Sequence, residues 1–314
     1  MPTEKLANDK LRHMRKLAFF QNARSAFKAY LKSLAFSPED RILLPAYIGW
    51  SAKEGSGVFD PVAELKLNST FYPLDEHLHI DLKLLEDIFK AGAIKLFVII
   101  HYFGYVDPGY EEAVSLARKY KVHVLEDEAH SLYTDIVGGM SGRLGDAAIF
   151  SLHKMLPIAK GGVLCVNGQV GSGMVVTSEY PDCSVAFDYD FYSIAKKRRA
   201  NAVALGEAMK KYSPEILPLR QSMKSGEIPQ TYPVIIRNVS RDKIYEMMNA
   251  SGYGVVSLYH TMIPEITQND FPRSFGVSNR ILNLPVHQDV EIEEIPAMVD
   301  ALANCVASLK DKTA

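Results

Sequence analysis

The sequence predicts an α/β protein with a three-layer, mainly parallel sheet and a smaller C-terminal α+β domain. Helix-like and strand-like patterns alternate through the first half of the chain, as they do in consecutive βαβ units. Residues 94–100 form an uninterrupted apolar run, which is typical of a strand buried on both faces of a parallel sheet. With 314 residues, 47% of them hydrophobic, the chain is long enough for two substantial cores.

Residues 1–190 are expected to form the larger domain. Apolar side chains recur at helical spacing through residues 3–35, which predicts a helix at the start of the chain. Short apolar runs and amphipathic segments then alternate. Strands are expected at 41–45, 94–100, 122–125, 147–151 and 162–166, and helices at 81–90 and 110–120.

Residues 191–314 are expected to form the smaller domain. The stretch 167–190 before it is rich in glycine and small polar residues without periodicity, so we expect irregular structure there. The predicted elements of the second domain are shorter and more mixed in order. They are helices at 191–212, 240–251 with Ser240 as N-cap, and 291–309, and strands at 232–237, 253–259 and 280–284.

Composition and charge exclude several classes of protein. The formal net charge is -2 and acidic and basic residues are intermixed, so no nucleic-acid or membrane surface is expected. The three cysteines are odd in number and widely spaced, unlike a disulfide framework. Without a signal-peptide pattern or a long apolar span, a cytoplasmic location is expected.

Histidines and acidic residues occur close together at two places, but neither predicts a metal site. His77 and His79 alternate along one segment, and Glu126, Asp127 and His130 cluster in another. Neither group has the ligand spacing of a zinc site together with a further partner. We therefore expect no metal.

Two apolar runs are separated by a glycine-rich segment, and each run is followed by a charged residue, an acid after the first and a lysine after the second. Asp127 ends the first run, and Lys154 comes just after the second. Pyridoxal phosphate needs a lysine amine to hold its aldehyde and a carboxylate to keep its ring nitrogen protonated. One segment supplies both groups, so the sequence predicts this cofactor; the alternative is that Lys154 is a surface lysine.

Several segments, in order along most of the chain, resemble the DegT/DnrJ/EryC1/StrS family of sugar aminotransferases. This family belongs to the aspartate aminotransferase fold type, fold type I of the enzymes that depend on pyridoxal phosphate. The matching segments are NARSAF from Asn22, RILLPAY from Arg41, IIHYFGYVDP from Ile99, VLEDEAHS from Val124, FSLHKMLPIAKGG from Phe150 and RILNLPVHQDV from Arg280.

The resemblance implies a role for four residues. Asp127 would pair with the pyridine nitrogen, His130 would hydrogen-bond the ring's 3-hydroxyl, and Ser151 would reach the phosphate. Lys154 would hold the aldehyde and move a proton during the reaction. That proton transfer requires a partly deprotonated Lys154, which burial and a neighbouring cation favour.

Two neighbours of Lys154 leave alternatives open. Lys160 immediately precedes a glycine pair and is a rival for the aldehyde, but the resemblance favours Lys154, because the family's lysine usually stands several residues before this pair, as Lys154 does. The family often has an acidic residue where Lys160 stands. His153 matters because a dehydratase branch of the family replaces the lysine with histidine; here the lysine is retained, which favours amino transfer.

Three further residues are predicted to contact the cofactor. Trp50 and Tyr47 are candidates for an aromatic that stacks on the pyridine ring, and Trp50 is favoured although its spacing is shifted from the family's pattern. Either could instead close the core. Arg24, in the turn before the first matching helix, is expected to contact the phosphate or to lie on a dimer surface.

The sequence thus predicts an aminotransferase that moves an amino group, from glutamate, to a keto group of a nucleotide-linked sugar. The resemblance supplies the substrate class, the amino donor and the expectation of a homodimer in which subunits complete each other's sites. The region after Gly162 lacks a segment that many family members use for this purpose. Two alternatives are therefore a dehydratase or isomerase, and an inactive relative that acts as a binding or assembly subunit.

Overall fold

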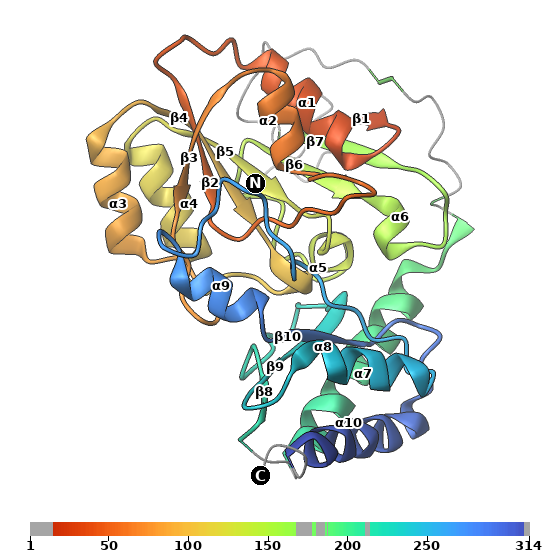
Figure 1. Ribbon diagram of the computed structural model, residues 1–314. Helices are drawn as coiled ribbons and strands as arrows, with labels where there is room; N and C mark the ends of the chain where they lie inside the picture. The colour runs from red at the N-terminus through yellow and green to blue at the C-terminus, as the bar shows by residue number, and fades with distance from the viewer. Residues whose placement is uncertain (1–14, 168–177, 180–185, 187, 211–213, 311–314) are drawn as a thin grey trace, which may run out of the picture.

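A seven-stranded sheet forms the centre of the larger part of the computed structural model (Figure 1). The structure describes residues 15–167, 178–179, 186, 188–210 and 214–310. The strand order is β1-β7-β6-β5-β4-β2-β3. The strands that pair in parallel are β2 (Arg41–Pro45), β3 (Asn68–Tyr72), β4 (Ile94–Ile100), β5 (His123–Asp127) and β6 (Ala147–Ser151).

Two antiparallel strands complete this sheet on the β6 side. β7 (Gly162–Asn167) pairs antiparallel with β6, and β1 (Arg15–Phe20) pairs antiparallel with β7. The buried strands β4 and β6 match the predicted apolar runs. The predicted mainly parallel α/β sheet is therefore confirmed.

Helices pack in pairs against this sheet. α1 (Ala23–Ser33) lies on β6 and β7 with α2 (Phe59–Glu64) beside it, and α3 (Leu82–Ala91) packs against α4 (Tyr110–Lys119), which contacts β5. Figure 1 shows strands of the sheet between the two pairs. Three short elements follow strand ends: η1 (Tyr102–Gly104), α5 (Leu132–Ile136) and α6 (Leu152–Met155).

A second, three-stranded antiparallel sheet has the order β10-β9-β8. Its strands are β8 (Ile216–Pro218), β9 (Thr231–Ile236) and β10 (Ile281–Pro285). The helices that share its apolar core are α7 (Phe191–Met209), α8 (Arg241–Ala250) and α10 (Ile295–Lys310), which is preceded by η3 (Ile292–Glu294). Ser240 caps α8, as predicted, by accepting a hydrogen bond from the Lys243 amide at 3.4 Å.

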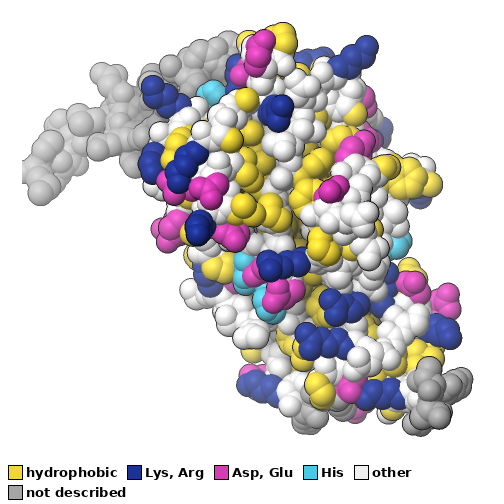
Figure 2. Space-filling model, turned by 60° about the vertical axis from the view of Figure 1, so that its left-hand side comes forward, with side chains coloured by type: hydrophobic (Ala, Val, Ile, Leu, Met, Phe, Trp, Pro, Cys, Tyr) yellow, Lys and Arg dark blue, Asp and Glu magenta, His cyan; other side chains and the backbone are white. Residues whose placement is uncertain are grey.

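The chain between α8 and β10 returns to the large sheet. α9 (Pro272–Ser278) contributes Val277 to the core of that sheet, and the Phe271 ring before it meets Phe71 edge-on at 6.1 Å. Within the described ranges, no helix has the length and apolar character needed to span a membrane. The face in Figure 2 carries both acidic and basic side chains, as the intermixed sequence predicted.

The predicted helix over residues 3–35 is wrong for its middle part, where the structure has strand β1. Arg15, at the start of β1, donates to both carboxylate oxygens of Asp135 at 2.9 and 2.7 Å and to the Asn167 side chain at 3.1 Å. These partners and the ladder with β7 outweigh the local helical spacing. Residues 3–14 lie outside the described part of the chain.

Other differences concern short elements. The strand predicted at 253–259 is reduced to a single bridge between Val256 and Asn283. The elements β8, α2, α5, α6 and α9 were not predicted because they have too few residues to give a clear period in the sequence. The strand β3 was not predicted because its sequence, NSTFY, begins with three polar residues and forms no apolar run. Most of the stretch 167–190, predicted as irregular, lies outside the described residues.

A glycine lets β7 approach the start of α1. A Cβ on Gly162 would lie 2.1 Å from the carbonyl carbon and oxygen of Asn22 and 2.6 Å from the Ala23 nitrogen. Asn22 itself caps α1 by accepting from the Ser25 amide at 2.9 Å, and the Gly161 amide donates to the Gln21 carbonyl at 2.9 Å. The first turn of α1 is therefore held against the end of β6 and the beginning of β7.

We predict that Gly162→Ala lowers the free energy of unfolding by about 1–3 kcal/mol, because the methyl group meets backbone atoms that cannot rotate away. Urea denaturation measures the change. Gly206→Ala is the control, since it lies inside α7 with only the Tyr232 hydroxyl 3.5 Å from its Cβ position, and alanine favours a helix. Equal stability of Gly162→Ala and the native chain would contradict the tight contact with α1.

Candidate active site

A cavity of about 610 Å³ lies where β5 and β6 end. The start of α1, the segment from residue 48 to residue 58, and residues 257–261 of the C-terminal part form its other walls. In open parallel sheets, ligands bind beyond the carboxyl ends of the strands. Its volume is within the range of roughly 300–1,000 Å³ that small-molecule sites have.

Most of the predicted site residues line this one cavity. The predicted residues that line it come from four separate parts of the chain. Of the predicted site residues, only Tyr47 is not part of the lining. The residues on the cavity wall are Arg24, Trp50, Asp127, His130, Ser151 and Lys154.

Asp127 is the last residue of β5 and is 5% exposed. Its Oδ1 accepts a hydrogen bond from the Ala129 amide at 2.9 Å. Burial raises the pKa of this carboxyl group, while the Ala129 amide and the positive charge of Lys154 oppose the rise. Asp127 is thus a nearly buried acid whose ionised form depends on cations and donors in the cavity.

Lys154 belongs to α6, directly after β6, and its side chain is exposed toward the cavity. Its Nζ lies 3.4 Å from Nε2 of His130. Removal from bulk water lowers the pKa of Lys154, with the charges of Asp127 and Glu54 opposing that effect. A lysine with a lowered pKa is a better nucleophile and a better base near neutral pH.

His130 is buried between the lysine and an aromatic ring. It stacks on Phe103, with ring centroids 5.9 Å apart and an interplanar angle of 15°. Burial and the adjacent Lys154 charge hold the pKa of His130 well below its usual value, so the ring is neutral. Its Nδ1 accepts from the Phe103 amide at 3.4 Å, which assigns the proton to Nε2, on the side of Lys154.

The end of the cavity at α1 is suited to an anion. Ser151 ends β6 and its hydroxyl lies 3.5 Å from ring nitrogens of His153, which also lines the cavity. Arg24 lies in the first turn of α1, where the helix dipole is positive, and its guanidinium is 3.4 Å from the Asp60 carboxylate and donates to the Glu54 carbonyl. The Asp60 pair offsets part of the Arg24 charge.

The two predicted stacking aromatics occupy different environments. Trp50 lines the cavity and is 42% exposed. Tyr47 is fully buried behind the cavity, where its ring is 5.4 Å from Tyr102 and 5.2 Å from Tyr259. Tyr259 itself reaches the cavity, and it was missed in the sequence because no local motif connects it to the lysine segment.

Lys160, the rival lysine, also lines the cavity and is exposed. No hydrogen bond of its amine to another described residue is found, whereas Lys154 lies beside His130. The structure therefore brings both lysines to one cavity and associates only Lys154 with the buried acid and histidine.

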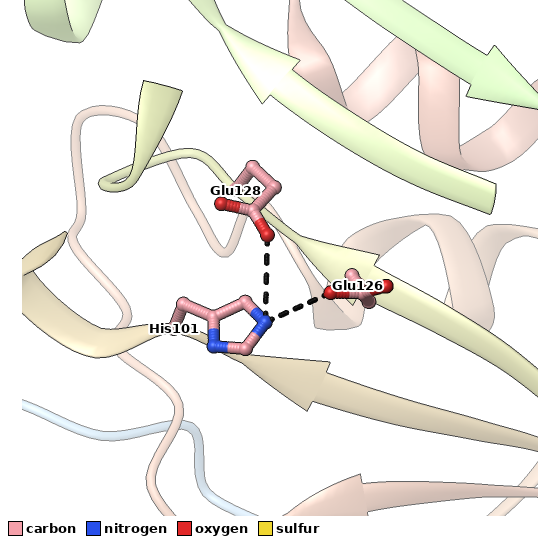
Figure 3. Close-up of side chains that lie close together, drawn as sticks. All are labelled: His101, Glu126 and Glu128. Atoms are coloured by element: carbon pink, nitrogen blue, oxygen red, sulfur yellow. Dashed lines mark hydrogen bonds and ion pairs between the residues drawn. The ribbon is translucent and has the colours of Figure 1, made fainter. Parts of the chain in front are cut away.

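His101 forms a buried cluster with Glu126 and Glu128, the two residues that flank Asp127 in the sequence (Figure 3). His101 Nε2 is 3.0 Å from Glu126 Oε2 and 3.4 Å from Glu128 Oε1. Glu126 also accepts hydrogen bonds from the Tyr110 hydroxyl and from the amides of residues 142, 144 and 145, at 2.6 to 3.0 Å. Although the three groups are near enough to share a metal ion, these donors already occupy the oxygens of Glu126.

The two glutamates of this cluster differ in protonation. Burial disfavours the charge on Glu126, but the hydrogen bonds from His101, Tyr110 and the backbone outweigh it and lower its pKa. Burial and the neighbouring charge of Glu126 raise the pKa of Glu128 well above its ordinary value. Glu126 is therefore the ionised member and Glu128 the protonated one.

The fold matches that of pyridoxal-phosphate-dependent aminotransferases. PseC of Helicobacter pylori, an aminotransferase involved in the biosynthesis of pseudoaminic acid, superposes with a TM-score of 0.76 at 18% identity, over 93% of this chain and 87% of that chain. The protein Spr1654 of Streptococcus pneumoniae, solved in a PMP-form, gives a TM-score of 0.75 at 16% identity, over 95% and 89% of the two chains.

The chain belongs to the DegT/DnrJ/EryC1/StrS aminotransferase family, whose family model matches residues 5–173. A curated relative is the UDP-4-amino-4-deoxy-L-arabinose--oxoglutarate aminotransferase of Shewanella sediminis, which is 26% identical over 216 residues. That match covers 67% of this chain and 52% of the relative, so the chain spans about half of the relative's length.

We predict that Glu128→Gln raises stability at neutral pH and reduces its fall with rising pH. The pKa of Glu128 is higher in the folded state than its value of 4.5 in the unfolded chain, so the folded state holds more protons and loses stability as pH rises above that value. Urea unfolding from about pH 5 to about pH 8 measures this slope.

Glu126→Gln is the matched control for this prediction. It removes the ionised acceptor from several buried donors, and we expect a loss of about 2–4 kcal/mol. If Glu128→Gln follows the same pH dependence as the native chain, the assignment of the proton to Glu128 is wrong.

Proposed function

We propose that this protein is a pyridoxal-phosphate-dependent aminotransferase that transfers an amino group from glutamate to a keto group of a nucleotide-linked sugar. The observation that carries the proposal is the convergence of Asp127, His130 and Lys154 on one cavity beside the N-terminus of α1. Family membership and the curated relative, whose name gives a UDP-linked amino sugar, support the substrate class.

The residues of the cavity fit the cofactor. It requires an amine, an acid for its ring nitrogen, a donor for its 3-hydroxyl and an anion site for its phosphate. Lys154, Asp127 and His130 offer the first three groups, and Ser151 with Arg24 and the start of α1 offers the fourth. Trp50 is the remaining predicted contact on the cavity wall, while Tyr47 supports the site from behind.

When bound, pyridoxal phosphate supplies an aldehyde that reacts with amines and a ring that accepts electrons. Asp127 would keep a proton on the ring nitrogen, since a buried carboxylate gains from an adjacent cation. Lys154, with its lowered pKa, would accept and return a proton at Nζ. His130 would donate its Nε2 proton toward the 3-hydroxyl and would carry no charge of its own.

We also propose a homodimer in the cytoplasm, with a domain boundary at residues 190 and 191. The dimer and the sharing of sites between subunits come from the family resemblance. Cys165 and Cys305 are buried free thiols, which suits a reducing compartment. Asp190 caps α7, the first helix of the proposed smaller domain, by accepting from the Ser193 amide at 3.0 Å.

We predict that the purified protein with pyridoxal phosphate has the visible absorption band of a lysine-bound cofactor and that Lys154→Ala abolishes it. Lys160→Ala is the matched control and should retain the band, because Lys154 alone is associated with His130. Glutamate should convert the band to that of the amine form of the cofactor. Absorption spectra of the native chain and both variants measure these changes.

Each contrary outcome identifies a different error. Loss of the band in Lys160→Ala and retention in Lys154→Ala would assign the chemistry to the other lysine. A band that glutamate leaves unchanged would contradict glutamate-dependent transamination and favour a dehydratase or isomerase. Absence of any cofactor binding would favour the inactive relative that acts as a binding subunit.

A further inference from the structure

Tyr259 occupies the space that a side chain on residue 49 would need. A Cβ on Gly49 would lie 2.8 Å from Cδ1 of Tyr259 and 3.3 Å from its Cε1. Gly49 is in the segment that was expected to supply the stacking aromatic, and the sequence has tryptophan one position later. The ring of Tyr259, from the C-terminal part of the chain, therefore fills the space beside Gly49 that a side chain at position 49 would occupy.

The ring of Tyr259 also packs against His130, which is proposed to contact the cofactor's 3-hydroxyl, and against Phe103. Its centroid is 5.7 Å from that of His130 at an interplanar angle of 69°, and 6.0 Å from that of Phe103. Burial and the nearby charge of Asp127 raise the pKa of the Tyr259 phenol, so it stays protonated. The side chain is half-buried and lines the cavity, which leaves part of its surface open to a ligand.

The backbone holds Tyr259 in an unusual conformation. Its φ of 60° is in the left-handed region, which is rare for a bulky residue and costs about 1–2 kcal/mol. The Ser278 hydroxyl contacts the carbonyls of Tyr259 and His260 at 2.8 and 3.1 Å. Such strain, maintained by surrounding hydrogen bonds, is common at ligand sites.

Hydrogen bonds fix the segment around Tyr259 to the loop that follows β2 and to β10. The Trp50 amide donates to the Thr261 carbonyl at 3.0 Å, and the Ile263 amide donates to the Ile48 carbonyl at 3.1 Å. On its other side, the Leu258 amide donates to the Asn283 side chain at 3.1 Å. These bonds set the position of the ring before any ligand binds.

We infer that Tyr259, rather than Trp50 or Tyr47, supplies the aromatic face that covers the pyridine ring of the cofactor. Asp127 and His130 are proposed to contact the ring's edges, which leaves its faces to be covered by other groups. Tyr47 is fully buried, does not line the cavity and packs its ring against Tyr259 at 5.2 Å, and no ring of the described residues is found packed on the more exposed Trp50. This inference rests on the proposed function.

The test compares cofactor binding by the apoprotein and its variants, using the dissociation constant of pyridoxal phosphate and the circular dichroism induced in its absorption band. We expect Tyr259→Leu to weaken binding about 3- to 10-fold and to reduce the induced signal, because an aromatic contact is lost. Tyr259→Phe should bind within about twofold of the native chain. Trp50→Leu should have a smaller effect than Tyr259→Leu.

Gly49→Ala provides an independent variant in case Tyr259→Leu fails to fold. The methyl group should displace the Tyr259 ring and weaken binding in the native background, but not further in a Tyr259→Leu background. Far-UV circular dichroism establishes that each variant is folded.

The outcomes separate this inference from the proposed function. If the native chain binds no pyridoxal phosphate, the proposed function and the inference both fail. If the native chain binds it while folded Tyr259→Leu or Gly49→Ala binds as tightly, only the role of Tyr259 is wrong. A larger loss in Trp50→Leu than in Tyr259→Leu would assign the aromatic face to Trp50.

Discussion

The parallel pairing of β5 with β6 is the constraint on which the site depends. Asp127 lies opposite Ile149 in this ladder, so Ser151 and the turn that carries Lys154 extend beyond the same edge of the sheet as the acid. Both strands are buried, and β7 fixes the far side of β6 through the register from Ala147 to Ser151. A shift of one residue in either strand would turn Asp127 or Ser151 to the other face.

The charges of the acids at the end of β5 complement this geometry. Glu126 and Asp127 end β5 and Glu128 follows directly, and three negative charges in one buried site would repel one another strongly. Hydrogen bonds satisfy Glu126, a proton neutralises Glu128, and Asp127 is left to face the cavity and Lys154. Of these three acids, only Asp127 lines the cavity and can be reached by a ligand.

Much of this arrangement could be predicted from the sequence because its signals are local. The apolar runs of β4, β5 and β6 and the residues Asp127, His130, Ser151 and Lys154 occur within one continuous stretch. β1 could not be predicted, because its strand conformation depends on an ion pair between Arg15 and Asp135, 120 residues apart, and on pairing with β7. The place of Tyr259 in the cavity could not be predicted either, since it comes from hydrogen bonds that its segment, through Thr261, Ile263 and Tyr259, makes with Trp50, Ile48 and Ser278.

The most direct test of the central claim is to load the protein with pyridoxal phosphate, reduce the lysine–cofactor bond with borohydride and identify the labelled lysine by peptide mass spectrometry. The account predicts that the label is on Lys154, the amine that shares its cavity with Asp127 and His130. A label on Lys160, or no labelled lysine at all, would contradict it.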